Sequence, residues 1–289
     1  MNQAHISSLE LIPRYDAPSS WWEHVPIAHW LIDKLKPEYI VELGTHYGVS
    51  FFSFCEAAET LATNTFTYAI DTWEGDSQAG YYNNEVYERV YEHFNSRHKT
   101  RGRLIRSTFD EAAEHFENNT IDIVHIDGLH TYEAVSHDYN KWKSKLKEGG
   151  TMMFHDWNVR EKDFGVWKLW EEIKSKGEFH CIEITNGHGL AIATKTIQKP
   201  IWHDELIEIL PVLKAKGCLL DELRRTKEKL AIANLRNEGQ KKREEQLNLH
   251  TSELTKQIKE KEKVLNIYKK GLAYRILRKV KSILKKRVG

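Results

Sequence analysis

Two short apolar segments of this chain each end with an aspartate and a histidine. The first ends in the sequence HIDGLH, which contains Asp127 and His130. The second ends in the sequence FHDW, which contains His155 and Asp156. Consecutive parallel strands joined by one helix are usually neighbours, so the two aspartates are expected at one edge of a sheet. Neighbouring carboxylates repel each other, and a hard divalent cation bound through oxygen relieves the repulsion. The spacing therefore predicts a metal site at Asp127 and Asp156.

The two histidines have predicted roles of their own. His155 is either a third metal ligand or the group that orients Asp156. His130 follows Asp127 by three residues on a loop that contains Gly128, a placement that suits a general base. The alternative is that these side chains are helix caps and a hydrogen-bonded core histidine. That alternative is preferred for a single residue, but not for two aspartates and two histidines at successive strand ends.

A second candidate site is the glycine-containing turn that follows residues 39–43. Its letters are ELGTHYGVS, with Glu42, Gly44, Gly48 and Ser50. Two glycines let the chain turn tightly and let a ligand approach the backbone, and the helix that starts near Ser50 offers free N–H groups. The spacing is neither the GxGxxG dinucleotide fingerprint nor a phosphate loop. Glu42 favours a cationic ligand, such as a sulfonium compound with an amino group, and an ordinary strand-to-helix turn is the alternative.

The next strand ends add groups that suit a nucleoside. Asp71 follows residues 66–70, and a carboxylate in that position accepts hydrogen bonds from both ribose hydroxyls. Trp73 is expected to cover an adenine face, and Ser107, after the third strand, is expected beside the adenine. For Asp71 alone a cap or turn role is the alternative, but the nearby glycine turn favours ribose binding.

A sheet is needed to bring these residues together, and strand-like and helix-like segments alternate from residue 38 to about 196. The predicted strands are residues 39–43, 66–70, 103–105, 121–126, 151–154, 181–184 and 190–194. The predicted helices are residues 51–61, 83–94, 109–116, 132–146 and 164–176, the third capped by Ser107 or Thr108 and the fourth ended by Gly149-Gly150. This alternation predicts a doubly wound, mostly parallel, Rossmann-like α/β sheet with an antiparallel last strand. Ligands bind such sheets beyond the carboxyl ends of the strands.

Two regions flank the predicted domain of residues 38–200. Residues 1–37 are an aromatic-rich helical lead-in that is expected to pack on the sheet edge or over a pocket. Residues 201–267 are predicted as a helical, coiled-coil-like extension that is interrupted near Gly239. Its heptad core positions include Ile209, Leu223, Leu254 and Leu265. A solvated single helix, or a helix folded back on the domain, is the alternative.

The charge of the chain is distributed unevenly. The net charge is +1, but residues 261–289 hold 11 of the 43 basic residues and one of the 42 acidic residues. Residues 268–289 are therefore predicted as a basic amphipathic helix that binds an anionic membrane surface, with a merely solvated tail as the alternative. Nucleic acid is disfavoured as a partner because no aromatic platform accompanies the charge. A homo-oligomer through the C-terminal helices is also expected.

The cysteines and the apolar stretches indicate the compartment. The 3 cysteines are far apart and form no CxxC pair, so a reducing environment is expected. The first residues do not resemble a secretory signal, and no apolar stretch approaches the roughly 20 residues that span a bilayer. A cytoplasmic protein is expected, peripheral at the inner membrane surface if its basic tail binds lipid.

Together the segments VELGTHYGVSFF, YAIDTWEGD, IDIVHIDGLHTYEAVSHDYNKWKSKLKEGGTMMFHDWNV and GHGLAIAT resemble class I S-adenosylmethionine-dependent methyltransferases. The branch that they resemble is that of metal-assisted sugar O-methyltransferases related to the macrocin-type enzymes. The resemblance spans about residues 38–194, and its most specific part is the pattern DGxHxY…GGxxxFHD. Where these relatives have a second carboxylate just before the last one, this chain has His155.

The resemblance implies a role for each group of site residues. The residues implied to hold S-adenosylmethionine are Glu42, Gly44, Gly48 and Asp71. Asp127 and Asp156 are implied to hold Mg²⁺ or a similar ion, and His130 to take the proton from a substrate hydroxyl. A metal that binds a substrate diol would orient it and lower the pKa of its hydroxyl.

The expected function is an S-adenosylmethionine-dependent O-methyltransferase that acts on a hydroxyl of a sugar, polysaccharide or related small acceptor. A methyltransferase of a lipid-linked or phenolic acceptor is one alternative. A catalytically silent scaffold that tethers partners through its coiled coil is another. A nicotinamide enzyme on the same fold is a third, and the missing GxGxxG counts against it.

Overall fold

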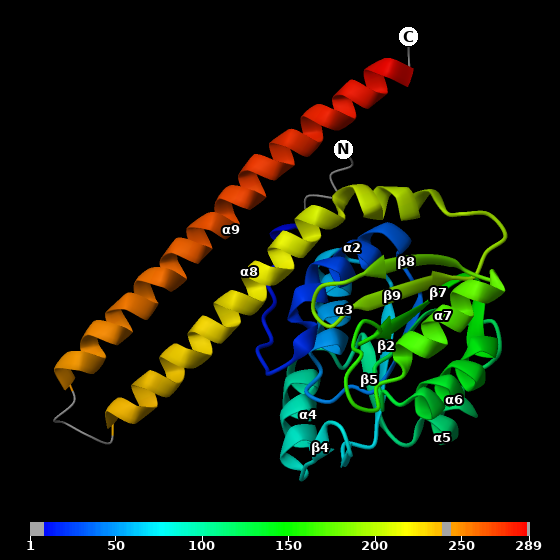
Figure 1. The fold of residues 1–289 in the computed structure, drawn as a ribbon, viewed down its shortest axis with the longest axis horizontal. Helices are drawn as coiled ribbons and strands as arrows, with labels where there is room; N and C mark the ends of the chain where they lie inside the picture. Colours follow the sequence, from blue (N-terminus) through cyan, green and yellow to red (C-terminus); the bar gives the residue numbers. More distant parts are fainter. Residues whose placement is uncertain (1–8, 239–243, 288–289) are drawn as a thin grey trace.

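The computed structural model describes residues 9–238 and 244–287, with side chains described for residues 9–234, 248–271 and 275. A seven-stranded sheet forms its centre, in the order β5-β2-β1-β6-β7-β9-β8 (Figure 1). Its strands are β1 (Tyr39–Leu43), β2 (Phe66–Asp71), β5 (Gly102–Arg106), β6 (Ile121–Ile126), β7 (Leu146–His155), β8 (His180–Ile184) and β9 (Leu190–Thr194). Neighbours run parallel except that β9 is antiparallel to both β7 and β8. The predicted doubly wound, mostly parallel sheet with an antiparallel last strand is confirmed.

The register of the central strands brings their carboxyl ends to one level. Leu43 of β1 lies opposite both Ile70 of β2 and Ile126 of β6, and Ile126 lies opposite Phe154 of β7. The carboxyl halves of these strands are buried and mostly apolar, as expected for parallel strands covered by helices on both faces. The residues that follow them therefore start from a common edge of the sheet.

Helices cover both faces of the sheet. On one face lie η1 (Ser20–His24), α2 (Val25–Leu35), α3 (Val49–Thr60) and α4 (Glu85–Arg97); on the other lie α5 (Phe109–Ala113), α6 (Tyr132–Trp142), the 3-10 turn η2 (Lys143–Lys145) and α7 (Val166–Lys176). Ile123 of β6 packs in the first layer and Val124 in the second, because successive side chains of a strand point to opposite faces. Thr108 caps α5 through a capping box with Glu111, as one of the two residues predicted for that role.

Two local features differ from the sequence prediction. The helix predicted to extend to residue 146 ends at Trp142, and β7 already begins at Leu146. Gly149-Gly150 therefore lies inside β7 and does not end the helix. The positive φ of Gly149 (78°) instead accompanies an irregularity in the pairing of β7 with β6. The antiparallel strand β9 also lies one position in from the edge, which β8 occupies.

The C-terminal region forms two long helices, α8 (Ile201–Glu238) and α9 (Glu244–Arg287), that lie side by side and antiparallel (Figure 1). α8 packs on η1 and α2, and α9 packs on α8. The expected heptad positions Ile209, Leu223, Leu254 and Leu265 are all buried. The two helices thus pair within one chain, and α8 lies against the domain as the folded-back alternative expects. Self-association of the chain stays a prediction.

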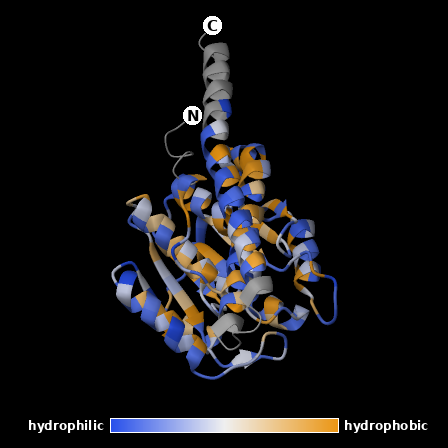
Figure 2. Cartoon of the chain, turned by 90° about the vertical axis from the view of Figure 1, so that its left-hand side faces the viewer, coloured by the Kyte–Doolittle hydropathy of each residue, from blue (hydrophilic) through white to orange (hydrophobic). Residues whose placement is uncertain are grey.

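The surface of the helix pair is largely polar. The outward side of α9 is mostly hydrophilic over its described residues (Figure 2). Side chains of the predicted basic amphipathic helix, such as Ile276, Leu277 and Arg278, lie outside the described residues, although α9 continues to Arg287. Over the described part of the chain, no helix combines the length and apolar character needed to cross a bilayer.

The contact between α8 and η1 leads to a stability prediction at Gly217. A Cβ at Gly217 would lie 2.1 Å from the backbone oxygen of Glu23. Alanine is favoured over glycine inside a helix by about 1 kcal/mol, but this clash outweighs the gain. We expect Gly217→Ala to lower the free energy of unfolding in urea by about 1–3 kcal/mol.

The matched control is Gly271→Ala in α9, where nothing lies within 4 Å of the added Cβ. This substitution is expected to raise the free energy of unfolding, because only the helix propensity changes. Equal shifts for the two variants would contradict the tight docking of α8 on η1.

Candidate active site

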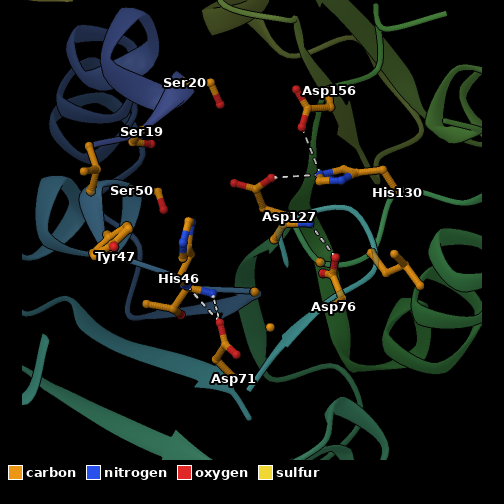
Figure 3. Close-up of a pocket in the computed structure, with 18 of the residues that line it drawn as sticks. Ser19, Ser20, His46, Tyr47, Ser50, Asp71, Asp76, Asp127, His130 and Asp156 are labelled. Carbon is orange, nitrogen blue, oxygen red and sulfur yellow. Dashed lines mark hydrogen bonds and ion pairs between the residues drawn. The ribbon is translucent and has the colours of Figure 1, made fainter. Parts of the chain in front are cut away.

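A cavity of about 730 Å³ opens at the carboxyl edge of the sheet, around the ends of β1, β2, β6 and β7 (Figure 3). This volume is typical of a site for a small molecule. The predicted site residues that line it are Gly44, Gly48, Ser50, Asp71, Asp127, His130 and Asp156. His155 is buried directly behind the last two aspartates and contacts both. The structure therefore brings eight of the eleven predicted residues to one place.

The turn after β1 passes very close to the end of β6. Gly44 has a φ of +87°, and a Cβ there would lie 2.2 Å from the backbone oxygen of Asp127. Glycine is the residue that combines this backbone conformation with such an approach. Gly48, with a φ of 81°, is the N-cap of α3, so the free N–H groups of the first helical turn begin at the cavity wall.

Asp71 has the turn-stabilising role that the sequence offers as the alternative to ribose binding. Its Oδ2 accepts hydrogen bonds from the backbone N–H groups of Thr45 and His46, both at 2.8 Å, and its Oδ1 accepts one from Trp73 at 2.7 Å. The carboxylate thereby ties the glycine turn to the end of β2, which Figure 3 shows at the floor of the site. Asp71 also borders the cavity, so it is placed to meet a ligand as well.

Three residues predicted to bind the cofactor lie outside the cavity lining. Glu42 is fully buried, and its Oε2 lies 3.0 Å from His125 Nδ1; burial raises the pKa of Glu42, and His125 opposes the rise. Trp73 is fully buried, and its indole N–H donates to the His46 carbonyl at 3.0 Å. The Ser107 hydroxyl donates to a glutamate of α5 at 3.1 Å.

The position of Glu42 follows from the alternation of side chains along β1. Because Glu42 stands one residue before the end of the strand, its side chain points into a helix layer and not toward the edge. Thr108 and Phe109, which follow Ser107, line the cavity in its place.

Asp127, Asp156, His130 and His155 form a compact cluster at the ends of β6 and β7. His130 Nε2 lies 3.3 Å from Asp127 Oδ1 and 3.0 Å from Asp156 Oδ2 (Figure 3). His155 Nδ1 lies 3.1 Å and 3.3 Å from the same two oxygens. Asp156 reaches this position through a left-handed backbone, with a φ of 59°, that turns the chain at the end of β7. Each imidazole thus bridges both carboxylates.

Pairing outweighs burial in the electrostatics of this cluster. Burial alone lowers the pKa of His130, but its hydrogen bonds to Asp127 and Asp156 raise the pKa to about 9. The same carboxylates raise the pKa of His155 well above its usual value despite its burial. The pKa values of both aspartates are in turn held low by the histidines, although burial works in the opposite direction. Without a bound cation, these contacts favour the imidazolium form of both histidines beside the two carboxylates.

This arrangement predicts how stability depends on pH. Because the pKa of folded His130 is about 9 and that of a free histidine is about 6.5, its pairing stabilises the fold fully below pH 6.5. The stabilisation is lost as the pH rises through 9. We expect the free energy of unfolding in a chelator-containing buffer to fall between pH 7 and 9.5 by up to about 3 kcal/mol. His130→Gln should flatten this slope, and an unchanged slope in that variant would contradict the pairing.

Two neighbours of His130 were not predicted from the sequence. Gln78 lies between β3 (Gly75–Asp76) and β4 (Gly80–Tyr81), and its Oε1 accepts from the His130 backbone N–H at 2.9 Å and from Nδ1 at 3.1 Å. The Phe164 ring stacks on the imidazole at 5.0 Å with an interplanar angle of 7°. The ring of His130 is therefore fixed on its Nδ1 side and on one face, which leaves Nε2 directed at the aspartates.

Other unpredicted residues reach the cavity from both flanking regions. Ser19 and Ser20 come from the lead-in, and Arg224 and Arg225 come from α8. His188 comes from the turn between β8 and β9, and its Nδ1 lies 3.1 Å from Asp156 Oδ1. No sequence motif relates these positions to the strand ends, because they are brought to the cavity by tertiary packing alone.

Comparison with known proteins agrees with the site. Residues 41–157 match the family model described as a methyltransferase domain. That segment contains the glycine turn, Asp71, and the aspartate–histidine cluster. The match therefore makes this segment similar to a methyltransferase domain, in agreement with the fold and the strand-end residues that the sequence predicted.

A curated relative and several solved structures are also similar. An uncharacterised protein, y4gI of Sinorhizobium fredii, is 44% identical over 159 residues, which are 55% of this chain and 17% of that protein. This chain thus spans about a sixth of that relative's length. A methyltransferase of Geobacter sulfurreducens is 14% identical with a TM-score of 0.47, over 68% of this chain and 90% of that one. The O-methyltransferase TomG of Streptomyces achromogenes, solved with S-adenosylmethionine, is 11% identical with a TM-score of 0.46, over 68% and 91% of the two chains.

Proposed function

We propose that this chain is an S-adenosylmethionine-dependent O-methyltransferase that acts on a hydroxyl of a sugar or a related small acceptor, assisted by a divalent cation. One observation carries the proposal. One cavity at the strand ends is bordered by a glycine turn, by a strand-end aspartate and by a cluster of two aspartates and two histidines, all within the segment that matches a methyltransferase domain. These are the parts needed to hold a nucleoside methyl donor beside an activated hydroxyl.

The residues present fit the methyl donor. The glycine turn exposes backbone at the wall of the cavity, and Asp71 keeps a cavity-facing carboxylate for ribose hydroxyls after accepting its three backbone hydrogen bonds. Phe109, beyond β5, offers an aromatic ring where an adenine is expected. S-adenosylmethionine supplies an electrophilic methyl group, so the protein needs mainly to align the acceptor oxygen with it.

The residues present also fit a divalent cation. Asp127, Asp156, His130 and His155 each offer a ligand atom, and these atoms all lie within 4.8 Å of one another. Asp127, Asp156 and His155 would hold the cation, so that Nε2 of His130 is kept for the hydroxyl proton. Carboxylate oxygens suit Mg²⁺, and the added imidazole nitrogens also suit transition metals such as Mn²⁺. A bound cation supplies positive charge that lowers the pKa of a coordinated hydroxyl.

His130 then acts as the general base. In the paired cluster its imidazole is protonated at neutral pH, and a protonated ring accepts no proton. When the carboxylates of Asp127 and Asp156 are neutralised by another cation, the pKa of His130 returns toward its usual range. Gln78 and Phe164 keep the ring in place, so Nε2 remains positioned to take the hydroxyl proton.

A transfer assay with matched acceptors tests the proposal. The intact chain is incubated with methyl-labelled S-adenosylmethionine, with Mg²⁺, Mn²⁺ or chelator, and with neutral sugars, sugar acids, sugar phosphates or catechols. We expect transfer to a sugar hydroxyl that is lost in chelator. Transfer to catechols alone would favour the phenolic alternative. Absence of transfer to all four classes by the folded, S-adenosylhomocysteine-binding protein would contradict the proposed acceptor class.

A further inference from the structure

The cavity extends beyond the methyltransferase domain, because α8 forms part of its wall. Arg224 and Arg225 line the same cavity as the glycine turn and the aspartate–histidine cluster, although they lie far outside residues 41–157. Ser19 and Ser20, at the start of η1, line it beside them, and Figure 3 places these serines across the cavity from Asp71. Packing of α8 on η1 thus adds a wall that the strand ends do not supply.

The position of this wall is fixed by close contacts. Gly217 of α8 meets the backbone of Glu23 so closely that a Cβ would lie 2.1 Å from its oxygen. One residue earlier, Lys216 Nζ donates to the backbone oxygen of Leu11 at 2.7 Å. Lys261 of α9 also pairs with α8. The two arginines therefore lie on a helix that packs tightly against the lead-in on one side and pairs with α9 on the other.

A buried carboxylate orients Arg225 and lies near Arg224. Asp221 Oδ2 lies 2.6 Å from Arg225 Nε, and Asp221 Oδ1 lies 3.9 Å from Arg224 Nε. Arg224 Nη1 also pairs with Glu228 at 2.9 Å. Because Asp221 engages Arg225 through Nε and 63% of the Arg225 side chain is exposed, the two terminal amino groups of its guanidinium remain for a ligand.

The charges around the cavity are separated. Asp71, Asp127 and Asp156 lie at the strand ends, whereas Arg224 and Arg225 line the cavity from α8. A planar guanidinium with two parallel N–H donors matches the geometry of a carboxylate or a phosphate and binds either through two hydrogen bonds. A neutral acceptor would gain nothing from this positive charge, and the exposed donors of Arg225 would stay hydrated.

We infer that the acceptor carries an anionic group, a carboxylate or a phosphate, which Arg225 binds with Arg224 beside it. The acceptor hydroxyl then faces the aspartate–histidine cluster on the opposite wall. This inference rests on the proposed methyltransferase function and adds the charge class of its substrate. The C-terminal extension becomes a specificity element of the active site.

Binding to the protein loaded with S-adenosylhomocysteine tests the inference. The loaded full chain is titrated by calorimetry with glucuronate, with glucose 1-phosphate and with the neutral methyl glucoside. We expect at least one charged probe to bind at least about tenfold more tightly than the neutral one, the value typical of a charge-assisted hydrogen bond. The relative affinities of the two charged probes then identify the carboxylate or the phosphate as the preferred group.

Two substitutions on α8 complete the test. Arg225→Gln should remove the preference for the charged probe, with about a tenfold weaker binding, and leave the affinity for the neutral probe unchanged. Lys229→Gln, which removes a charge one turn further along α8 at an exposed position outside the cavity lining, should change neither affinity.

Several results would overturn the inference. Equal binding of charged and neutral probes, or no binding of either charged probe to the loaded protein, would remove the anionic subsite. If Arg225→Gln weakened the binding of S-adenosylhomocysteine itself, Arg225 would serve the donor carboxylate and not the acceptor. Failure of the wild-type chain to bind S-adenosylhomocysteine would instead refute the proposed function, so the two failures are distinguishable.

Discussion

Replacement of Asp156 with asparagine is expected to abolish most of the methyl transfer. Asparagine tolerates the left-handed backbone that Asp156 adopts (φ 59°), so the substitution removes the charge and keeps the chain path. A divalent cation would lose one of two carboxylates, and we expect the transfer rate at saturating Mg²⁺ or Mn²⁺ to fall by about 10²–10³-fold. In chelator, His130 and His155 would share one carboxylate, and the free energy of unfolding should fall by about 3 kcal/mol.

The matched control is a surface aspartate that also pairs with a histidine. Asp110 Oδ1 lies 2.8 Å from His137 Nε2, and both side chains are more than half exposed. Asp110→Asn should change the transfer rate and the stability little, because exposed pairs contribute weakly. Retention of full, metal-dependent activity by Asp156→Asn would contradict the assignment of the cluster as the reaction centre.

Substitution of Gly44 by alanine is expected to remove binding of the methyl donor and to destabilise the domain. The new Cβ would lie 2.2 Å from the backbone oxygen of Asp127, and φ is +87°. The turn after β1 would have to move away from the end of β6, which separates the donor side of the cavity from Asp127. We expect a loss of about 3 kcal/mol or more in the free energy of unfolding and no measurable heat of S-adenosylhomocysteine binding.

Substitution of Gly149 by alanine is the control that measures the effect of the left-handed backbone without a steric clash. Its φ of +78° is close to that of Gly44, but nothing lies within 4 Å of an added Cβ. Gly149→Ala should cost only about 1–2 kcal/mol from the left-handed conformation and leave donor binding intact. If Gly44→Ala behaved like Gly149→Ala, the close approach of the turn to β6 would not matter for the site.

The sheet could be predicted from the sequence because its strands carry their own signal. Segments such as YIVEL and IDIVHI are short, apolar and β-branched, and their alternation with helices leaves few possible topologies. The strand-end positions of Asp127 and Asp156 follow from that topology. Their shared contacts with two histidines depend on the register of β6 with β7, which the structure supplies.

The differences between the predicted and the observed cavity lining have two physical causes. Glu42 and Trp73 were placed by their position along the chain, whereas the direction of each side chain decides whether it reaches the cavity or the core. Gln78, Arg224 and Arg225 come from segments whose sequence carries no site motif, and only packing brings them to the strand ends. The sequence predicted the long C-terminal helices, but it did not predict that α8 would line the cavity.

Calorimetric titration of S-adenosylhomocysteine into the intact chain, with and without Mg²⁺, tests the central claim most directly. The claim is that the glycine turn and Asp71 form a binding site for the methyl donor. Asp71→Ala releases three backbone N–H groups and should weaken binding by about tenfold or more. Asp122→Ala is the matched control, because Asp122 accepts from the N–H groups of Glu38 and Tyr39 at the other end of the sheet. We predict binding by the wild type and by Asp122→Ala that Asp71→Ala weakens; no heat from the folded wild-type chain would contradict the claim.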